Sequence, residues 1–131
     1  GQGVDKDPKA AFKLIQDAAV SGYAPAQYEL GMLYLLGTGG EKNAAEALKW
    51  FEKSAYKGIT ESQYQLGIAY GAGSGAKEDK IKSYVWLIIA AKSANPKMVK
   101  ARDRQMKKLN KEEMNLSKIL LESINSKMLN Q

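Results

Sequence analysis

The chain has 131 residues and a net charge of +6, and it contains neither cysteine nor histidine. A chain of this length can bury one core, and the two missing residue types remove the usual zinc ligands, the thiolate nucleophile, the disulfide and the usual general base. The longest apolar run, Val85 to Ala91, is far shorter than the roughly 20 residues that cross a bilayer, so we expect no transmembrane segment.

The sequence repeats itself at a spacing of 36 residues. The first copy contains Ala19, Gly22, Gln27, Tyr28, Leu30, Gly31, Tyr34, Gly37 and Gly39. The second contains Ala55, Gly58, Gln63, Tyr64, Leu66, Gly67, Tyr70, Gly73 and Gly75. Such a period is typical of stacked supersecondary units. The same register places Gly1 and Gly3 on Gly37 and Gly39, so we expect residues 1–6 to be the closing loop of a preceding, absent repeat.

Each unit is predicted to contain two helices. Asp7, Asn43 and Asp79 are good N-cap residues and recur at the repeat spacing, so they predict the start of three first helices. Gly22 and Gly58 are placed to end the first two of these helices. Second helices are then expected over 25–36 and 60–72.

The third unit breaks the sequence register after Ala91. Asn95 and Pro96 still predict a helix to about residue 109, and Asn110 with Glu113 predicts a last helix to about residue 129. The expected fold is therefore an all-α solenoid of antiparallel helix pairs, with about seven helices in a right-handed superhelix and a C-terminal capping helix. Its expected divisions are 1–6, repeats over 7–42 and 43–78, a divergent repeat over 79–109, and the C-terminal helix over 110–131.

Two segments resemble a known repeat family. Residues 47–58 read Ala-Leu-Lys-Trp-Phe-Glu-Lys-Ser-Ala-Tyr-Lys-Gly, and residues 63–75 read Gln-Tyr-Gln-Leu-Gly-Ile-Ala-Tyr-Gly-Ala-Gly-Ser-Gly. They look like the Sel-one-like repeat, a relative of tetratricopeptide repeats, and the resemblance covers about residues 1–94. It implies a scaffold or adaptor that binds other proteins. It also favours a bacterial envelope, periplasmic or secreted location.

The outward positions of the first helices are the candidate contacts for a protein or peptide partner on the concave face. They are Lys13, Gln16, Asp17, Lys49, Glu52, Lys53 and Tyr56. The third unit carries apolar residues at the matching positions, Val85, Ile88 and Ile89, which something should cover. The last helix has a suitable stripe of Met114, Leu116, Leu120, Leu121, Ile124 and Met128. It could fold back over them, or they could contact a partner or a second copy.

A basic segment holds the whole charge excess. Residues 1–91 have ten basic and ten acidic side chains, whereas residues 92–111 have eight basic side chains and only Asp103. This segment is an alternative site for nucleic acid or an anionic surface. The residues nearest one side of the helix are Lys97, Lys100, Arg104, Lys107, Lys108 and Lys111.

Other motifs favour structural interpretations. The glycines of 71–77 could hold a phosphate, but they follow a helix and recur as an inter-repeat turn would. The acidic pairs at 78–79 and 112–113 are better explained as caps and solvated charge than as a general acid and base. The recurring Tyr28, Tyr34, Tyr64 and Tyr70 could stack bases or glycans, but they suit an inter-repeat core better.

These observations define the expected function. We expect no enzyme activity, no catalytic residue, no metal and no cofactor. A protein or peptide partner is expected, nucleic acid is the less favoured partner, and a weak dimer through exposed repeat ends is possible.

Overall fold

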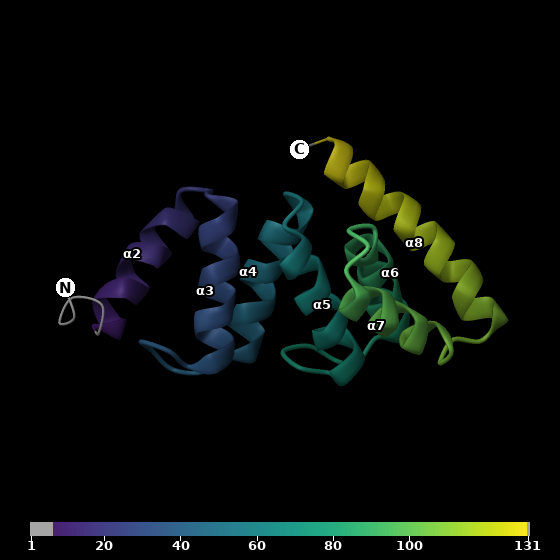
Figure 1. Cartoon of the computed structure of the whole chain (residues 1–131), viewed down its shortest axis with the longest axis horizontal. Helices are drawn as coiled ribbons and strands as arrows, with labels where there is room; N and C mark the ends of the chain where they lie inside the picture. Colours follow the sequence, from purple (N-terminus) through teal and green to yellow (C-terminus); the bar gives the residue numbers. More distant parts are fainter. Residues whose placement is uncertain (1–6, 131) are drawn as a thin grey trace.

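The computed structural model describes residues 7–130, which form seven α-helices and no strand (Figure 1). The expectation for residues 1–6 lies outside the described residues. The helices stand in adjacent pairs along the molecule and are, in chain order, α2 (Pro8–Val20), α3 (Ala24–Leu36), α4 (Ala44–Tyr56), α5 (Thr60–Ala72), α6 (Lys80–Ala91), α7 (Pro96–Met106) and α8 (Lys111–Leu129). Here α2, α4 and α6 are the first helices of successive units, and α3, α5 and α7 are the second helices. The predicted all-helical solenoid is confirmed.

Each first helix begins at the predicted N-cap. The side-chain oxygens of Asp7, Asn43 and Asp79 accept a hydrogen bond from the backbone N–H three residues later, at 3.1, 3.0 and 2.9 Å. These bonds satisfy N–H groups that the first turn of a helix leaves without a partner, and each stabilises its helix by about 1 kcal/mol. The 36-residue spacing of the caps is therefore the spacing of the first helices.

A left-handed residue forms the turn between the two helices of every unit. Gly22 and Gly58 have φ of 102° and 93°, and Ala94 has φ of 64° at the matching place in the third unit. The second helix α7 then begins 36 residues after α5. The predicted break of register after Ala91 is therefore wrong for the backbone, because an alanine adopts the turn that glycine makes in the other units. The break holds only for the side chains.

Glycines in the second helices bring the next unit close. A Cβ on Gly31 would lie 2.6 Å from the ring of Phe51, and a Cβ on Gly67 would lie 2.6 Å from Cγ of Leu87. The Oγ of Ser83 donates to the Gly67 carbonyl at 2.7 Å across the same contact. Successive units therefore pack through one recurring interface.

The core runs through the stack in two connected parts. Phe51, Leu66 and Trp86 belong to the larger cluster of buried residues, and Ala19 and Leu30 belong to a smaller cluster in the first unit. Tyr34 packs against both clusters. The prediction that the recurring tyrosines belong to the core is confirmed in part. Tyr70 is buried, and Tyr28 and Tyr34 are half-buried against the larger cluster.

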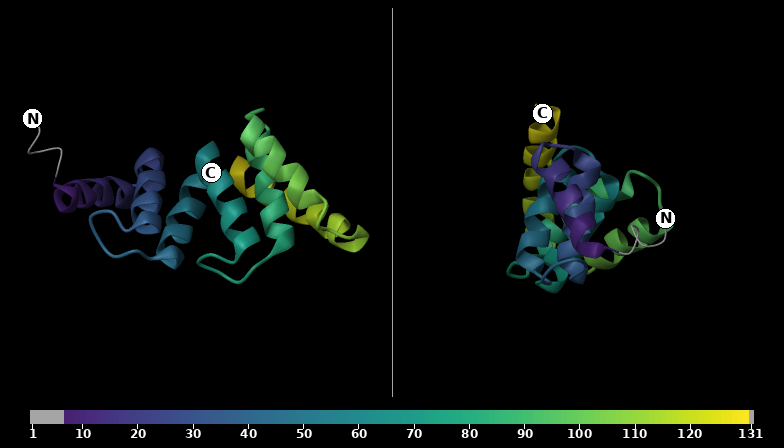
Figure 2. Two further views of the ribbon diagram at one scale, coloured as in Figure 1. Left: turned by 60° about the horizontal axis from the view of Figure 1, so that its bottom comes forward. Right: turned by 90° about the vertical axis from the view of Figure 1, so that its left-hand side faces the viewer.

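Charged residues occupy the outer packing positions of α7. The places of Leu66 and Gly67 in α5 are taken by Arg102 and Asp103 in α7, and these two side chains form an ion pair at 2.8 Å. A first helix stacked here as α6 stacks on α5 would bury this pair, which is costly. The last helix, α8, instead packs against α6 and reaches α4. The right-hand view of Figure 2 shows α7 and α8 on opposite sides of the stack.

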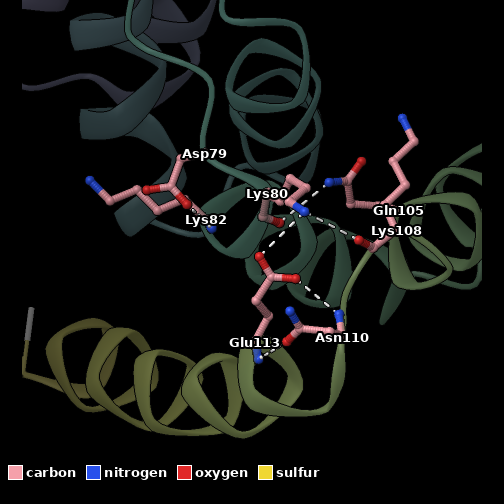
Figure 3. Close-up of polar contacts among 7 residues, drawn as sticks. All are labelled: Asp79, Lys80, Lys82, Gln105, Lys108, Asn110 and Glu113. Atoms are coloured by element: carbon pink, nitrogen blue, oxygen red, sulfur yellow. Dashed lines mark hydrogen bonds and ion pairs between the residues drawn. The ribbon is translucent and has the colours of Figure 1, made fainter.

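A polar junction fixes the start of α8 (Figure 3). The side chain of Asn110 accepts from the N–H of Glu113 at 2.8 Å, and the carboxylate of Glu113 accepts from the N–H of Asn110 at 2.9 Å. The Nζ of Lys80, in α6, lies 3.3 Å from the other carboxylate oxygen of Glu113 and donates to the carbonyl of Lys108 at 3.4 Å. The Nε2 of Gln105 donates to the carbonyl of Lys80 at 3.4 Å. These bonds set the direction in which α8 leaves α7.

Candidate functional site

The outward positions of α4 line a set of adjoining hollows. Glu52 and Tyr56 face the C-terminal end of α8, where they enclose an open hollow of about 470 Å³ with Lys127 and Asn130. The same two residues line a hollow of about 310 Å³ toward α3 and one of about 190 Å³ toward α6. We call the surface formed by Glu52, Lys53, Tyr56, Lys127 and Asn130 the α4–α8 groove.

Aromatic contacts restrain side chains in and beside the groove. The rings of Tyr56 and Trp86 meet edge to face, with centroids 5.2 Å apart. The Nζ of Lys53 lies 5.5 Å from the centroid of Trp50, and the Nζ of Lys82 lies 5.2 Å from that of Tyr70. Cation–π and edge-to-face contacts of this kind restrain the side chains without removing their polar ends from solvent.

The groove is polar and of mixed charge. Burial raises the pKa of Tyr56 and of Tyr70, and the nearby Glu52 carboxylate raises both further. Both phenols are therefore neutral near pH 7 and can donate or accept hydrogen bonds. Glu52 forms no ion pair within residues 7–130, so its carboxylate is available beside the ammonium groups of Lys53 and Lys127.

The candidate contacts of α2 lie apart from these hollows. Lys13 and Asp17 pair with each other at 2.9 Å on the exposed side of α2, and Gln16 is half-buried beside them. In α4, Lys49 is exposed and approaches Glu46 at 3.8 Å. The structure thus gathers Glu52, Lys53 and Tyr56 at one place and leaves the other candidates on the open surface.

The apolar candidates of α6 are covered. Val85 is 0% exposed, Ile89 is 5% exposed, and Ile88 is half-buried. Val85 and Ile89 belong to the same buried cluster as Ile124 of α8. The prediction that Val85 and Ile89 contact a partner is therefore wrong, because α8 and the neighbouring helices bury both side chains. The predicted capping role of the last helix is confirmed.

The basic candidates share the solvent side of α7 and the start of α8. All six are exposed, while Met98, Ala101 and Gln105 face the interior. The Nζ of Lys97 reaches over the ring of Tyr64 in α5, 4.8 Å from its centroid. We call these six the basic face: Lys97, Lys100, Arg104, Lys107, Lys108 and Lys111.

Sequence reasoning missed the contribution of α8 to the groove. Lys127 and Asn130 line it from a helix that is far away in the chain. The apolar stripe of α8 predicted that the helix folds back, but it carried no signal of which first helix the polar end would reach. Only the geometry of α8 against α6 and α4 places these two side chains beside Glu52.

The glycine-rich segment after α5 is a packed turn. Gly73 ends α5 with φ of 69°, and Gly75, with φ of 83°, lies against the first turn of α4, where an added Cβ would strike the carbonyl of Ala44.

Within residues 7–130, no group of three or more acidic side chains is arranged to hold a metal ion. Over the same residues, no helix has the length and hydropathy needed to traverse a bilayer.

The two ends of the stack differ. On α2, Leu14 is 71% exposed at the position where Trp50 and Trp86 pack in the later units. At the other end, α7 presents the ion pair of Arg102 and Asp103. The weak dimer expected through exposed repeat ends stays a prediction.

Comparisons with known proteins agree with this architecture. A family model described as Sel1 repeat matches residues 1–23, 24–59 and 60–95. The structure of a protective antigen from uropathogenic Escherichia coli strains, which displays an SLR fold, is similar with 29% identity and a TM-score of 0.87 over 92% of this chain and 26% of that one. A Sel1 repeat protein from Oxalobacter formigenes is similar with 30% identity and a TM-score of 0.68 over 71% of this chain and 38% of that one. The chain spans less than two-fifths of the length of either, and no curated protein matches it significantly.

Proposed function

The chain belongs to the Sel1 repeat family, and on this premise we propose that it is a scaffold without catalytic activity that binds a segment of a partner protein in the α4–α8 groove. Repeats of this family generally serve protein interaction. The observation that carries the proposal is that Glu52 and Tyr56 line three adjoining hollows. A stacked-helix array provides such extended surfaces between its rigid helices.

The chemistry of the groove indicates the kind of segment it takes. Glu52 supplies a carboxylate, Lys53 and Lys127 supply ammonium groups, and Asn130 and the Tyr56 hydroxyl supply neutral hydrogen-bonding groups. A polar segment with one basic side chain for Glu52 fits this set better than an apolar helix does, because an apolar helix would leave these groups without partners. Lys13, Gln16, Asp17 and Lys49 lie apart from the hollows and stay candidate contacts outside this groove.

Site-specific crosslinking tests this proposal. A photoreactive amino acid at Lys53 should capture a partner protein, whereas the same group at Glu29, an exposed position on α3, should not. With the identified partner purified, calorimetry on Glu52→Lys and Tyr56→Ala should show losses of about tenfold or more, since each removes about 1.4 kcal/mol or more of contact energy. Lys118→Glu, on the outer side of α8, is the matched control and should bind normally. Equal capture from both positions, or unchanged affinity for both groove variants, would contradict the proposal.

A further inference from the structure

The basic face is a cationic surface that follows α7 and reaches the first residue of α8. None of its six side chains takes part in an ion pair within residues 7–130. Residues 92–111 hold eight of the basic side chains and a single acid, while residues 1–91 are balanced at ten and ten. At about 100° per residue, Lys97, Lys100 and Arg104 lie within about 60° of the circumference of α7, and the other three side chains follow the end of this helix at Met106. The whole charge excess of the chain is therefore concentrated on one narrow surface.

A groove runs beside this surface, between α5 and α7. Its hollow of about 210 Å³ is lined by Arg104 and Lys108, by the apolar Ile68, Ala72 and Leu87, and by the polar Ser83 and Gln105. Figure 3 shows the side chain of Lys108 extending away from Glu113. Its ammonium group is thus directed away from the junction that fixes α8.

The preceding unit holds the apolar counterpart of this groove. A hollow of about 90 Å³ between α3 and α5 is lined by Leu35, Phe51 and Ala69, and it shares Ile68 and Ala72 with the first groove. The matching positions 36 residues apart are Ile68 with Arg104 and Ala72 with Lys108. Two equivalent grooves therefore lie side by side, and the basic residues occur only at the second.

We propose that this second-helix surface binds an acidic segment of a partner protein. One apolar side chain of the segment would occupy the α3–α5 hollow over Ile68, which is 39% exposed, and neighbouring carboxylates would pair with Arg104 and Lys108. Arginine pairs with carboxylates in a bidentate geometry, which favours a defined site over diffuse attraction. The inference does not depend on the α4–α8 groove, because the two surfaces have no lining residue in common.

The shape of the surface favours a peptide over nucleic acid. Lys97, Lys100 and Arg104 lie on α7, which has 11 residues and is about 16 Å long, and the other three follow its end at positions 107–111. The hollow beside them is partly apolar. Backbone binding of nucleic acid needs cationic groups that follow many phosphates. The ring of Tyr64, which could stack a base, is covered by Lys97.

Fluorescence anisotropy with defined probes tests this inference on the full chain. The probe is a fluorescein-labelled peptide with one leucine followed by four glutamates, compared with its glutamine analogue and its serine-for-leucine analogue. A labelled 12-nucleotide RNA and vesicles of phosphatidylglycerol with phosphatidylcholine are the competing ligands. The variants are Arg104→Glu with Lys108→Glu and, as a control with the same charge change, Lys9→Glu with Lys118→Glu. Circular dichroism checks that both variants fold.

The expected result is binding of the acidic peptide, with both analogues at least about tenfold weaker. Each analogue loses contacts whose total is about 1.4 kcal/mol or more. The Arg104 and Lys108 variant should lose about tenfold or more in affinity, whereas the control variant should lose less than about threefold. No binding of the acidic peptide, equal loss in both variants, or tighter binding of RNA or vesicles would overturn the proposal. Equal binding of the serine analogue would overturn the role of the apolar hollow. The affinity of a partner for the Glu52→Lys variant tests only the α4–α8 groove and has no bearing on this second-helix surface.

Discussion

Replacing Ala94 by glycine should stabilise the protein. Ala94 has φ of 64° in the turn between α6 and α7, where the other units have Gly22 and Gly58. The left-handed conformation costs a residue with a Cβ about 1–2 kcal/mol. Part of this gain, about 0.4–1 kcal/mol, is lost because glycine raises the conformational entropy of the unfolded chain. Because Ala94 is exposed, little packing is lost, and the net gain should be about 0.5–1 kcal/mol.

The reverse change in the second unit provides the matched control. A Cβ on Gly58 would meet no atom within 4 Å, so Gly58→Ala tests the backbone alone and should lose about the same amount. Urea unfolding followed by circular dichroism at 222 nm measures both free energies of unfolding. In thermal unfolding, the two midpoints should move apart by several degrees, roughly 2–4 °C in each direction. A destabilised Ala94→Gly, or shifts of the same sign in both variants, would refute the claim that the third unit keeps the backbone register.

Three further predictions follow from the packing and the polar junction. Gly67→Ala should lower the free energy of unfolding by about 1–2 kcal/mol, because the clash with Leu87 outweighs the better helix propensity of alanine; chemical denaturation measures this, and a stabilised variant would contradict the close contact. Ile124→Ala should cost about 2–4 kcal/mol and speed hydrogen exchange in α6, since Ile124 is 4% exposed within the core cluster; unchanged exchange there would contradict the covering role of α8. The pKa of Glu113 is lowered first by its hydrogen bond from Asn110 and also by Lys80. The ionised Glu113 therefore adds to the free energy of unfolding above the ordinary pKa of 4.5, and this stabilisation is lost as the pH falls through the lower pKa of the folded protein. Glu113→Gln should weaken this loss of stability on acidification, and an identical pH profile in both proteins would contradict the prediction.

The sequence predicted the helical pairs because their signals are local and repeated. A single side chain caps each first helix, so Asp7, Asn43 and Asp79 could be placed from their spacing alone. Asn110 and Glu113 similarly marked the start of the last helix, three residues apart as a capping box requires. These features depend on residues within one helical turn, and a sequence contains that information directly.

The third unit shows where side-chain matching fails. Its turn has Ala94 in place of a glycine, and α7 has Arg102 and Asp103 in place of an apolar pair, so the repeat is no longer visible in the sequence after Ala91. The backbone continues in register because α7 still buries Met98 and Ala101 against the interior. A fold can therefore keep its period at positions where the residues change, provided that the inward side chains remain apolar or small.

The candidate groove could be predicted only in part. Glu52 and Tyr56 followed from the outward face of α4, since helical spacing decides which side chains point away from the neighbouring helices. The other wall depends on where α8 crosses the first helices. That crossing depends on the polar junction at Glu113 and on the packing of α8 against α6, which are contacts between parts of the chain far apart in sequence. The same packing buries Val85 and Ile89, which the sequence alone left as possible contacts.

Hydrogen exchange of the full chain, measured with and without its purified partner, tests whether the α4–α8 groove is the binding surface. We expect binding to slow exchange at the end of α4, over residues 52–57, and at the end of α8, over residues 126–130, because these segments line the α4–α8 groove. Exchange in α2 should change little, since its candidate contacts lie outside the hollows. Protection confined to α5 and α7, or a uniform change throughout the chain, would contradict the assignment of the α4–α8 groove as the partner-binding site.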